Sequence, residues 1–123
     1  NASLGISQLK KINLFKKNKK KIFNFYKKIF SKDKYIKLLE PRKNLDSNYW
    51  LNTIILKNSK SLNKKKLMHV LAKNKIFARS IWKPVHLMKA YKHYQSMNLK
   101  ETESIYKKSI TLPSSPFLWR IKN

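Results

Sequence analysis

Apolar side chains recur every three or four residues along the first quarter of the chain. From Leu4 to Phe30 they fall on one side of a helix, and no proline interrupts the run. Lysines fill most of the opposite side from Lys10 to Lys28. The spacing therefore predicts one long amphipathic helix over residues 1–31. At about 1.5 Å per residue it would be roughly 45 Å long, enough to connect two domains.

Residues 49–56 have the composition of a buried β-strand. They carry Tyr, Trp, Thr and two Ile, and the polar members Asn52 and Thr53 are short. Two further short strands are predicted at 76–78 and 110–112, the second of them closed by a proline.

Helical patterns separate these strands. Residues 64–74 place apolar side chains on one side, with Ser61 as a candidate N-cap. Residues 99–108 predict a shorter helix with Glu101 in its first turn. No clear period is found in three segments: 32–47, 87–98 and 114–123. The order helix, strand, helix, strand, loop, helix, strand predicts an α+β fold, with a small sheet and packed helices.

Charge is the most unusual feature of the composition. Lys and Arg number 30 against 5 Asp and Glu, a formal net charge of +25. Such an excess is typical of nucleic-acid binding, because cations displace counterions from phosphates. It also fits the codon bias of an AT-rich genome, since nearly all of it is lysine spread along the chain. We favour the bias, because recognition surfaces prefer arginine. A small nucleic-acid-binding protein, for example one associated with a ribosome, stays the alternative.

Several other classes are disfavoured by the composition. The absence of cysteine excludes disulfides and thiolate metal sites. No apolar run approaches the roughly 18 residues that span a bilayer, so we expect no membrane-spanning segment. A basic amphipathic helix lying on an anionic membrane surface remains a third hypothesis.

A catalytic apparatus is hard to assemble from this chain. The few carboxylates form no evident pair, and the histidines lack the spacing of a metal site. Gly5 is the only glycine, so a glycine-rich phosphate loop is absent. We predict neither a catalytic residue nor a metal ligand within this chain, and we interpret His69 and His93 as structural or surface residues.

The segment from Arg79 to His86 is the strongest candidate for ligand contact. Arg79 follows apolar residues 76–78, so a strand would carry its guanidinium to the edge of the sheet. A guanidinium near the Trp82 indole and an imidazole suits an anionic, ring-bearing ligand. The residues alone fit equally well a core tryptophan, a surface arginine and a hydrogen-bonded structural histidine.

Short motifs then follow one another along the chain. They are NASLGISQL at 1–9, NYWLN at 48–52, NKIFARSIWKPVH at 74–86, LKETE at 99–103 and ITLPSS at 110–115. They resemble, in the same order, the "NAALGxAQL", "NYW", "NGIxxRPxWxPxH", "L..AE" and "xxLPSS" motifs of the DegT/DnrJ/EryC1/StrS aminotransferases. The NYWLN wording is most similar to members that aminate nucleotide-linked 4-keto sugars of the legionaminic-acid type.

This resemblance implies a fold-type I pyridoxal 5'-phosphate (PLP) aminotransferase, cytoplasmic and homodimeric. Such an enzyme moves an amino group, usually from glutamate, to a nucleotide-linked keto sugar in surface polysaccharide or glycan synthesis. The family's catalytic lysine precedes the first motif. We therefore expect this chain to be an inactive C-terminal fragment, with PLP bound mainly by a large domain outside it.

The resemblance also assigns parts and residues. Residues 1–31 would form an interdomain helix and residues 32–123 the small C-terminal domain. Arg79, Trp82 and His86 are implied as substrate contacts. Asn1 is implied to lie near the cofactor and the dimer interface.

Two residues depart from the family pattern. Lys75 stands where the family has glycine, and Ser80 stands where it has proline. Because asparagine tolerates the left-handed conformation, we expect Asn74 to make the turn in place of the glycine.

Overall fold

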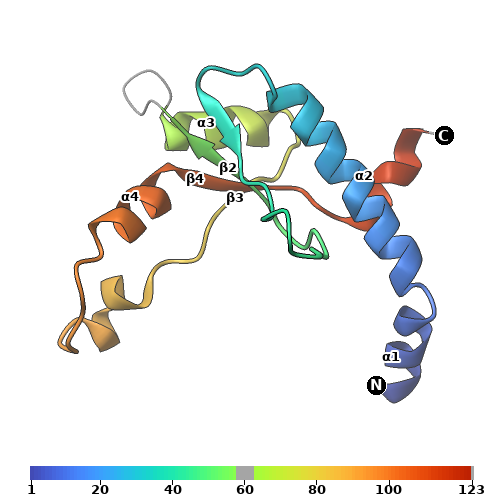
Figure 1. Ribbon diagram of the computed structural model, residues 1–123, viewed down its shortest axis with the longest axis horizontal. Helices are drawn as coiled ribbons and strands as arrows, with labels where there is room; N and C mark the ends of the chain where they lie inside the picture. The colour runs from blue at the N-terminus through green and yellow to red at the C-terminus, as the bar shows by residue number, and fades with distance from the viewer. Residues whose placement is uncertain (58–62, 123) are drawn as a thin grey trace.

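The fold is built on a four-stranded antiparallel sheet. The computed structural model describes residues 1–57 and 63–122. The strands lie in the order β1-β2-β4-β3, so β2 and β4 form the centre (Figure 1). Their bounds are Ile36–Leu38 for β1, Asn52–Leu56 for β2, Arg79–Ser80 for β3 and Ser109–Leu112 for β4. The sheet and its helices confirm the predicted α+β class.

One face of the sheet carries the core. Along β2 burial alternates: Asn52, Ile54 and Leu56 are almost fully buried, and Thr53 and Ile55 are half-buried. Ile54 pairs with Ile110 of β4, which is 0% exposed. Paired residues share a face, so these side chains form one apolar layer. Phe23 from the helix above the sheet closes the same cluster.

Among the described residues, helices α2, α3 and α4 accompany the sheet, and α1 precedes them (Figure 1). Their bounds are Ala2–Leu9 for α1, Ile12–Phe30 for α2, Lys64–Lys73 for α3 and Lys100–Lys108 for α4. The predicted helices at 64–74 and 99–108 are thus confirmed. Asn63 caps α3, because its side chain accepts hydrogen bonds from the amides of Lys65 and Lys66. The predicted cap, Ser61, lies outside the described residues.

The prediction of one continuous helix over residues 1–31 is wrong. The helix is interrupted at Lys10 and Lys11, where Lys11 adopts φ −103° and ψ 2°. Its N–H bonds to the Gln8 carbonyl at 3.0 Å, which tightens the last turn of α1. Because α1 buries none of its residues and contains serines and a glycine, neither packing nor propensity sustains a continuous helix there.

The predicted strand 49–56 is shorter than its composition suggests. Tyr49 has a positive φ of 51°, so the strand begins only at Asn52. The amides that precede the strand bind side chains: Ser47 Oγ accepts a hydrogen bond from Tyr49 N–H, and Asn48 Oδ1 accepts one from Trp50 N–H. These local bonds compete with the strand ladder.

Other elements differ from the predicted ones. The strand expected at 76–78 lies at Arg79–Ser80, where pairing with Thr111 and Ile110 begins. Strand β1 falls in a segment without a clear period and was not predicted. Three short 3-10 helices were also not predicted: η1 at Val85–Leu87, η2 at Lys89–Tyr91 and η3 at Pro116–Lys122.

The left-handed turn after α3 is made by Lys75 and not by Asn74. Lys75 has a φ of 60°, whereas Asn74 has a φ of −89°. The Asn74 side chain instead donates to the Val70 carbonyl at 2.8 Å. The turn therefore falls on the position where the family pattern has glycine, and lysine adopts the conformation that glycine would take without strain.

Candidate functional site

The segment that carries the predicted site residues starts at the edge of the sheet. Arg79 lies in β3, an edge strand, and not beyond the end of a strand at 76–78 as predicted. The chain then leaves the sheet and passes through Trp82 to His86 in η1. It runs on into a projecting arm that returns to α4 (Figure 1).

Arg79 belongs to a polar row on the face of the sheet opposite the core. It pairs with Thr111, and Thr111 pairs with Thr53 of β2, so the three side chains share one face. Both threonines are half-buried and Arg79 is exposed. Among the described residues, none of these three side chains has a hydrogen-bond or ion-pair partner. A guanidinium and two hydroxyls are thus available to a ligand at the same level of the sheet.

Trp82 does not lie in the core. It is 74% exposed and meets Trp50, which is 56% exposed, with ring centroids 5.8 Å apart and planes inclined by 63°. Trp50 is held through its backbone carbonyl, which accepts hydrogen bonds from Ser114 Oγ and Lys19 Nζ. Trp50 precedes β2 and Trp82 follows β3, and their indoles form one exposed aromatic pair.

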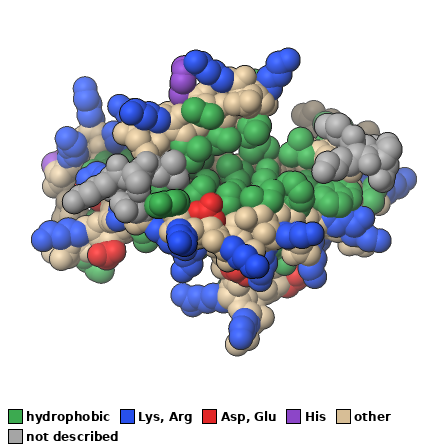
Figure 2. All heavy atoms as spheres, turned by 90° about the horizontal axis from the view of Figure 1, so that it is seen from above, with side chains coloured by type: hydrophobic (Ala, Val, Ile, Leu, Met, Phe, Trp, Pro, Cys, Tyr) green, Lys and Arg blue, Asp and Glu red, His purple; other side chains and the backbone are tan. Residues whose placement is uncertain are grey.

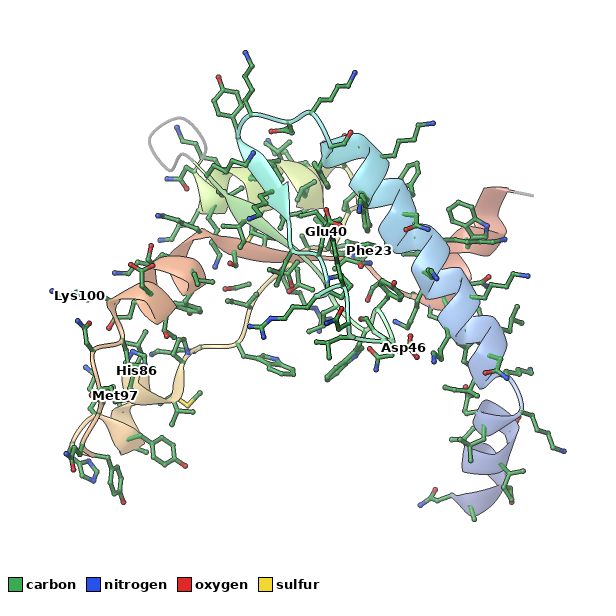
Figure 3. All side chains as sticks on the ribbon, viewed as in Figure 1. Phe23, Glu40, Asp46, His86, Met97 and Lys100 are labelled. Carbon is green, nitrogen blue, oxygen red and sulfur yellow. The ribbon has the colours of Figure 1, made fainter. Side chains whose placement is uncertain are left out.

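His86 contacts a different element. Its Nε2 lies 3.3 Å from Glu103 Oε1 of α4, and Lys107 Nζ lies 3.8 Å from the other carboxylate oxygen. Figure 3 shows His86 in the arm beside Met97, and both residues line a hollow of about 340 Å³. The described contacts join none of Arg79, Trp82 and His86 to another of the three, because each contacts a different neighbour.

Asn1 lies at the beginning of α1, where it is exposed and its side chain forms no cap hydrogen bond. Leu4 and Leu9 of the same helix are exposed as well, at 66% and 67%. The first turn of α1 therefore contacts no core within the described part of the chain.

Two lysines are partly withdrawn from water. Burial lowers the pKa of Lys19 and also that of Lys64. Lys19 Nζ donates to the Ser114 carbonyl at 2.7 Å, and Lys64 Nζ donates to Ser80 Oγ at 2.7 Å and to the Tyr106 carbonyl. Both amines thus have hydrogen-bond partners within the fold. No group of His, Asp or Glu among the described residues could hold a metal ion.

An apolar groove lies between α2, the end of α3 and η3. Its volume is about 530 Å³. It is lined mainly by apolar side chains, among them Phe25, Ile29, Ile76 and Leu118. Figure 2 shows a band of apolar side chains on the upper side of the molecule, with lysines gathered around it.

Comparison with known proteins identifies the chain. Residues 1–120 match the DegT/DnrJ/EryC1/StrS aminotransferase family. The chain belongs to this family. The resemblance carried by its short motifs is thereby confirmed, and the DegT/DnrJ/EryC1/StrS assignment extends over nearly the whole chain.

Individual relatives agree with this assignment. EpsN of Bacillus subtilis, described as a putative pyridoxal phosphate-dependent aminotransferase, is 28% identical over 117 residues, which are 92% of this chain and 30% of EpsN. PseC of Helicobacter pylori, an aminotransferase of pseudoaminic acid biosynthesis, is 28% identical, with a TM-score of 0.82 over 92% of this chain and 31% of PseC. The fold is shared by a putative sugar aminotransferase of Streptococcus pneumoniae, Spr1654 in its PLP form. That structure has a TM-score of 0.81 at 24% identity and covers 93% of this chain and 30% of its own.

The chain thus spans less than a third of the length of these relatives. Within its described residues, no helix is both long and apolar enough to cross a membrane.

Several residues of the candidate site were not predicted from the sequence. Trp50, Thr53 and Thr111 join it only through the sheet register and the ring contact. The available signal was the NYWLN motif, which we interpreted as a buried strand. No sequence pattern indicated that Glu103 is the partner of His86, because the two residues come together only when the arm folds back to α4.

Proposed function

We propose that the chain is the C-terminal part of a PLP-dependent aminotransferase acting on a nucleotide-linked keto sugar, with glutamate as amino donor. The observation that carries the proposal is the family match over residues 1–120, with relatives that include PseC. The product would be an amino sugar for a surface polysaccharide or glycan, made in the cytoplasm by a homodimer.

In this proposal the cofactor is bound by the part of the protein that these 123 residues do not span. PLP supplies the carrier for the amino group between donor and acceptor. The chain's own contribution is to substrate binding, through Arg79, Trp82 and His86. The exposed start of α1, with Asn1, would pack near the cofactor and the second subunit, and residues 1–31 would connect a large domain to the small domain 32–123.

The electrostatics of the candidate site support an anionic substrate. Arg79 has no partner among the described residues, and Lys83 follows it by four positions. With no ion-pair partner among the described residues, the guanidinium is available to a phosphate or carboxylate.

The proposal is tested with the product of the complete gene, supplied with PLP, glutamate and a UDP-linked 4-keto sugar. We expect formation of 2-oxoglutarate and a UDP-amino sugar in equal amounts, measured by mass spectrometry. Absence of transfer from glutamate, alanine or glutamine to UDP-, GDP- and dTDP-linked keto sugars would count against the proposal.

The net charge of +25 favours a second candidate, binding to nucleic acid. It is tested by titrating RNA against the same protein over a range of salt concentrations. Tight binding at about 0.15 M salt that weakens steeply with added salt would support it, because phosphate contacts release counterions. Aminotransfer without such binding would support the interpretation that the lysine excess results from codon bias.

A further inference from the structure

Strand β3 is the shortest strand of the sheet. It consists of Arg79 and Ser80, both exposed, and among the described strands it pairs with β4 alone. The chain leaves the sheet directly after Ser80 and enters the projecting arm (Figure 1). The positions of the Arg79 backbone and of the start of the arm therefore depend on a short pairing from one side.

The side chain of Lys64 reaches this strand from another element. Lys64 is the first residue of α3, and its Nζ donates to Ser80 Oγ at 2.7 Å. The same Nζ donates to the carbonyl of Tyr106 in α4 at 2.9 Å and lies 5.0 Å from the centre of the Tyr106 ring. The two partners are 16 and 42 positions away from Lys64 in the sequence. One ammonium group thus connects β3 to two helices.

This placement of the ammonium group is unfavourable apart from its contacts. A positive charge in the first turn of a helix opposes the helix dipole, and the first turn of α3 contains no acidic residue. Lys64 is half-buried, and burial lowers the pKa of its ammonium group. Among the described residues it has no carboxylate partner, so two neutral oxygens and the Tyr106 ring offset these costs. Lys64 is therefore held at a defined place, unlike a lysine that extends into water.

The residue that accepts this bond is one of the two departures from the family pattern. Ser80 stands where the family motif has proline. Proline fixes its own φ and reduces the conformational freedom of the chain, but its ring has no hydroxyl. Serine leaves the backbone freer, and its hydroxyl gives Lys64 an acceptor. The hydrogen bond therefore restrains the chain at the position where a proline ring would restrain it.

We propose that Lys64 is a positioning residue, which fixes β3 and the start of the arm through Ser80 and so holds Arg79 in place for the substrate. This proposal rests on the proposed function, because it takes Arg79 as a substrate contact. Lys64 itself contacts no substrate in this proposal and acts only through the strand.

The first measurement is amide hydrogen exchange of the complete gene product, followed by mass spectrometry of the peptides that contain β3. We expect Lys64→Met and Ser80→Ala each to lower the protection of β3 by about fivefold or more and to leave that of β2 unchanged. The double variant should resemble Lys64→Met, because both changes remove the same bond. Lys66→Met is the matched control, since Lys66 lies in the same turn of α3 and is exposed.

The second measurement separates positioning from a merely structural role. Lys64→Met should raise KM for the nucleotide-linked keto sugar by about threefold or more and change kcat little, because it displaces a binding group. Adding Ser80→Pro to Lys64→Met should restore most of the KM, since the proline ring then restrains the chain. A merely structural lysine would give neither the selective rise in KM nor the rescue by proline.

Three results would overturn the proposal. The protection of β3 would be the same in Lys64→Met as in the wild type, or β2 and β3 would lose protection alike, or β3 would loosen in an active enzyme without a change in KM.

The proposed function and the role of Lys64 can fail separately. Amino transfer in a protein where Lys64→Met alters neither exchange nor KM would refute the role of Lys64 and leave the aminotransferase function. Selective loosening of β3 by Lys64→Met, in a protein whose wild type transfers no amino group, would refute that function and leave the restraint on β3.

Discussion

Replacing Lys75 by glycine should stabilise the fold, although it removes a side chain. Lys75 occupies the position after the C-cap of α3 with a φ of 60°. Its N–H bonds to the Ala72 carbonyl at 2.9 Å, and the Ile76 N–H bonds to the Leu71 carbonyl at 2.8 Å. This is the hydrogen-bond pair of a Schellman motif, whose left-handed residue is usually glycine.

The size of the effect follows from two opposing terms. A residue with a Cβ in the left-handed region costs about 1–2 kcal/mol, and glycine avoids this cost. Glycine loses roughly 0.5–1 kcal/mol through the greater freedom of the unfolded chain. The net gain for Lys75→Gly is therefore about 0.5–1 kcal/mol, equivalent to roughly 2–5 °C in melting temperature for a chain of this size.

The assay is thermal and urea unfolding followed by circular dichroism at the helical band. Two variants serve as controls. Lys75→Ala keeps the Cβ and should match the wild type closely, whereas Lys73→Gly, inside α3, should cost about 1 kcal/mol. The reasoning is refuted if Lys75→Ala stabilises as much as Lys75→Gly, because the gain would then come from loss of the lysine charge and not from the backbone.

Two further variants test the core and the packing of α2. Ile110→Ala, at the centre of the sheet and 0% exposed, should cost about 2–5 kcal/mol in urea unfolding, and a loss under about 1 kcal/mol would contradict the core assignment. The Tyr26 hydroxyl donates to the Pro113 carbonyl at 3.0 Å, and burial raises the pKa of Tyr26. Its contribution to stability is therefore present below about pH 10 and falls as the pH rises further, because the unfolded state ionises first. Tyr26→Phe should lower the urea midpoint near neutral pH. The stability of this variant should fall less than that of the wild type between about pH 9 and pH 11, and parallel profiles of urea midpoint against pH would refute this role.

The parts of the fold that could be predicted are those where local pattern and packing agree. Helix α3 has an apolar side that faces the core cluster, and β4 is short, apolar and closed by Pro113. The break at Lys11 was missed because the apolar spacing continues through it while the packing does not. The position of Tyr49 was missed because two side-chain hydrogen bonds outcompete its high strand propensity.

The candidate site was predictable only in part. The strand expected at 76–78 lies instead at Arg79–Ser80, so Arg79 is part of the edge strand β3 and does not follow a strand. The placement of Thr111 and Thr53 beside Arg79 depends on the register of three strands, which no local sequence pattern reveals. Trp50 has a residue type that favours burial, yet it is 56% exposed and contacts Trp82. The roles of Arg79, Trp82, His86 and Asn1 stay predictions.

The central claim is that residues 1–123 are the small C-terminal part of a PLP enzyme whose cofactor is bound by another part of the protein. The most direct measurement is borohydride reduction of the complete gene product with PLP, followed by peptide mass spectrometry to find the modified lysine. The account predicts one stoichiometric pyridoxyl-lysine outside residues 1–123, and no such adduct when the 123-residue chain is treated alone. A stoichiometric adduct on a lysine within this chain would contradict it.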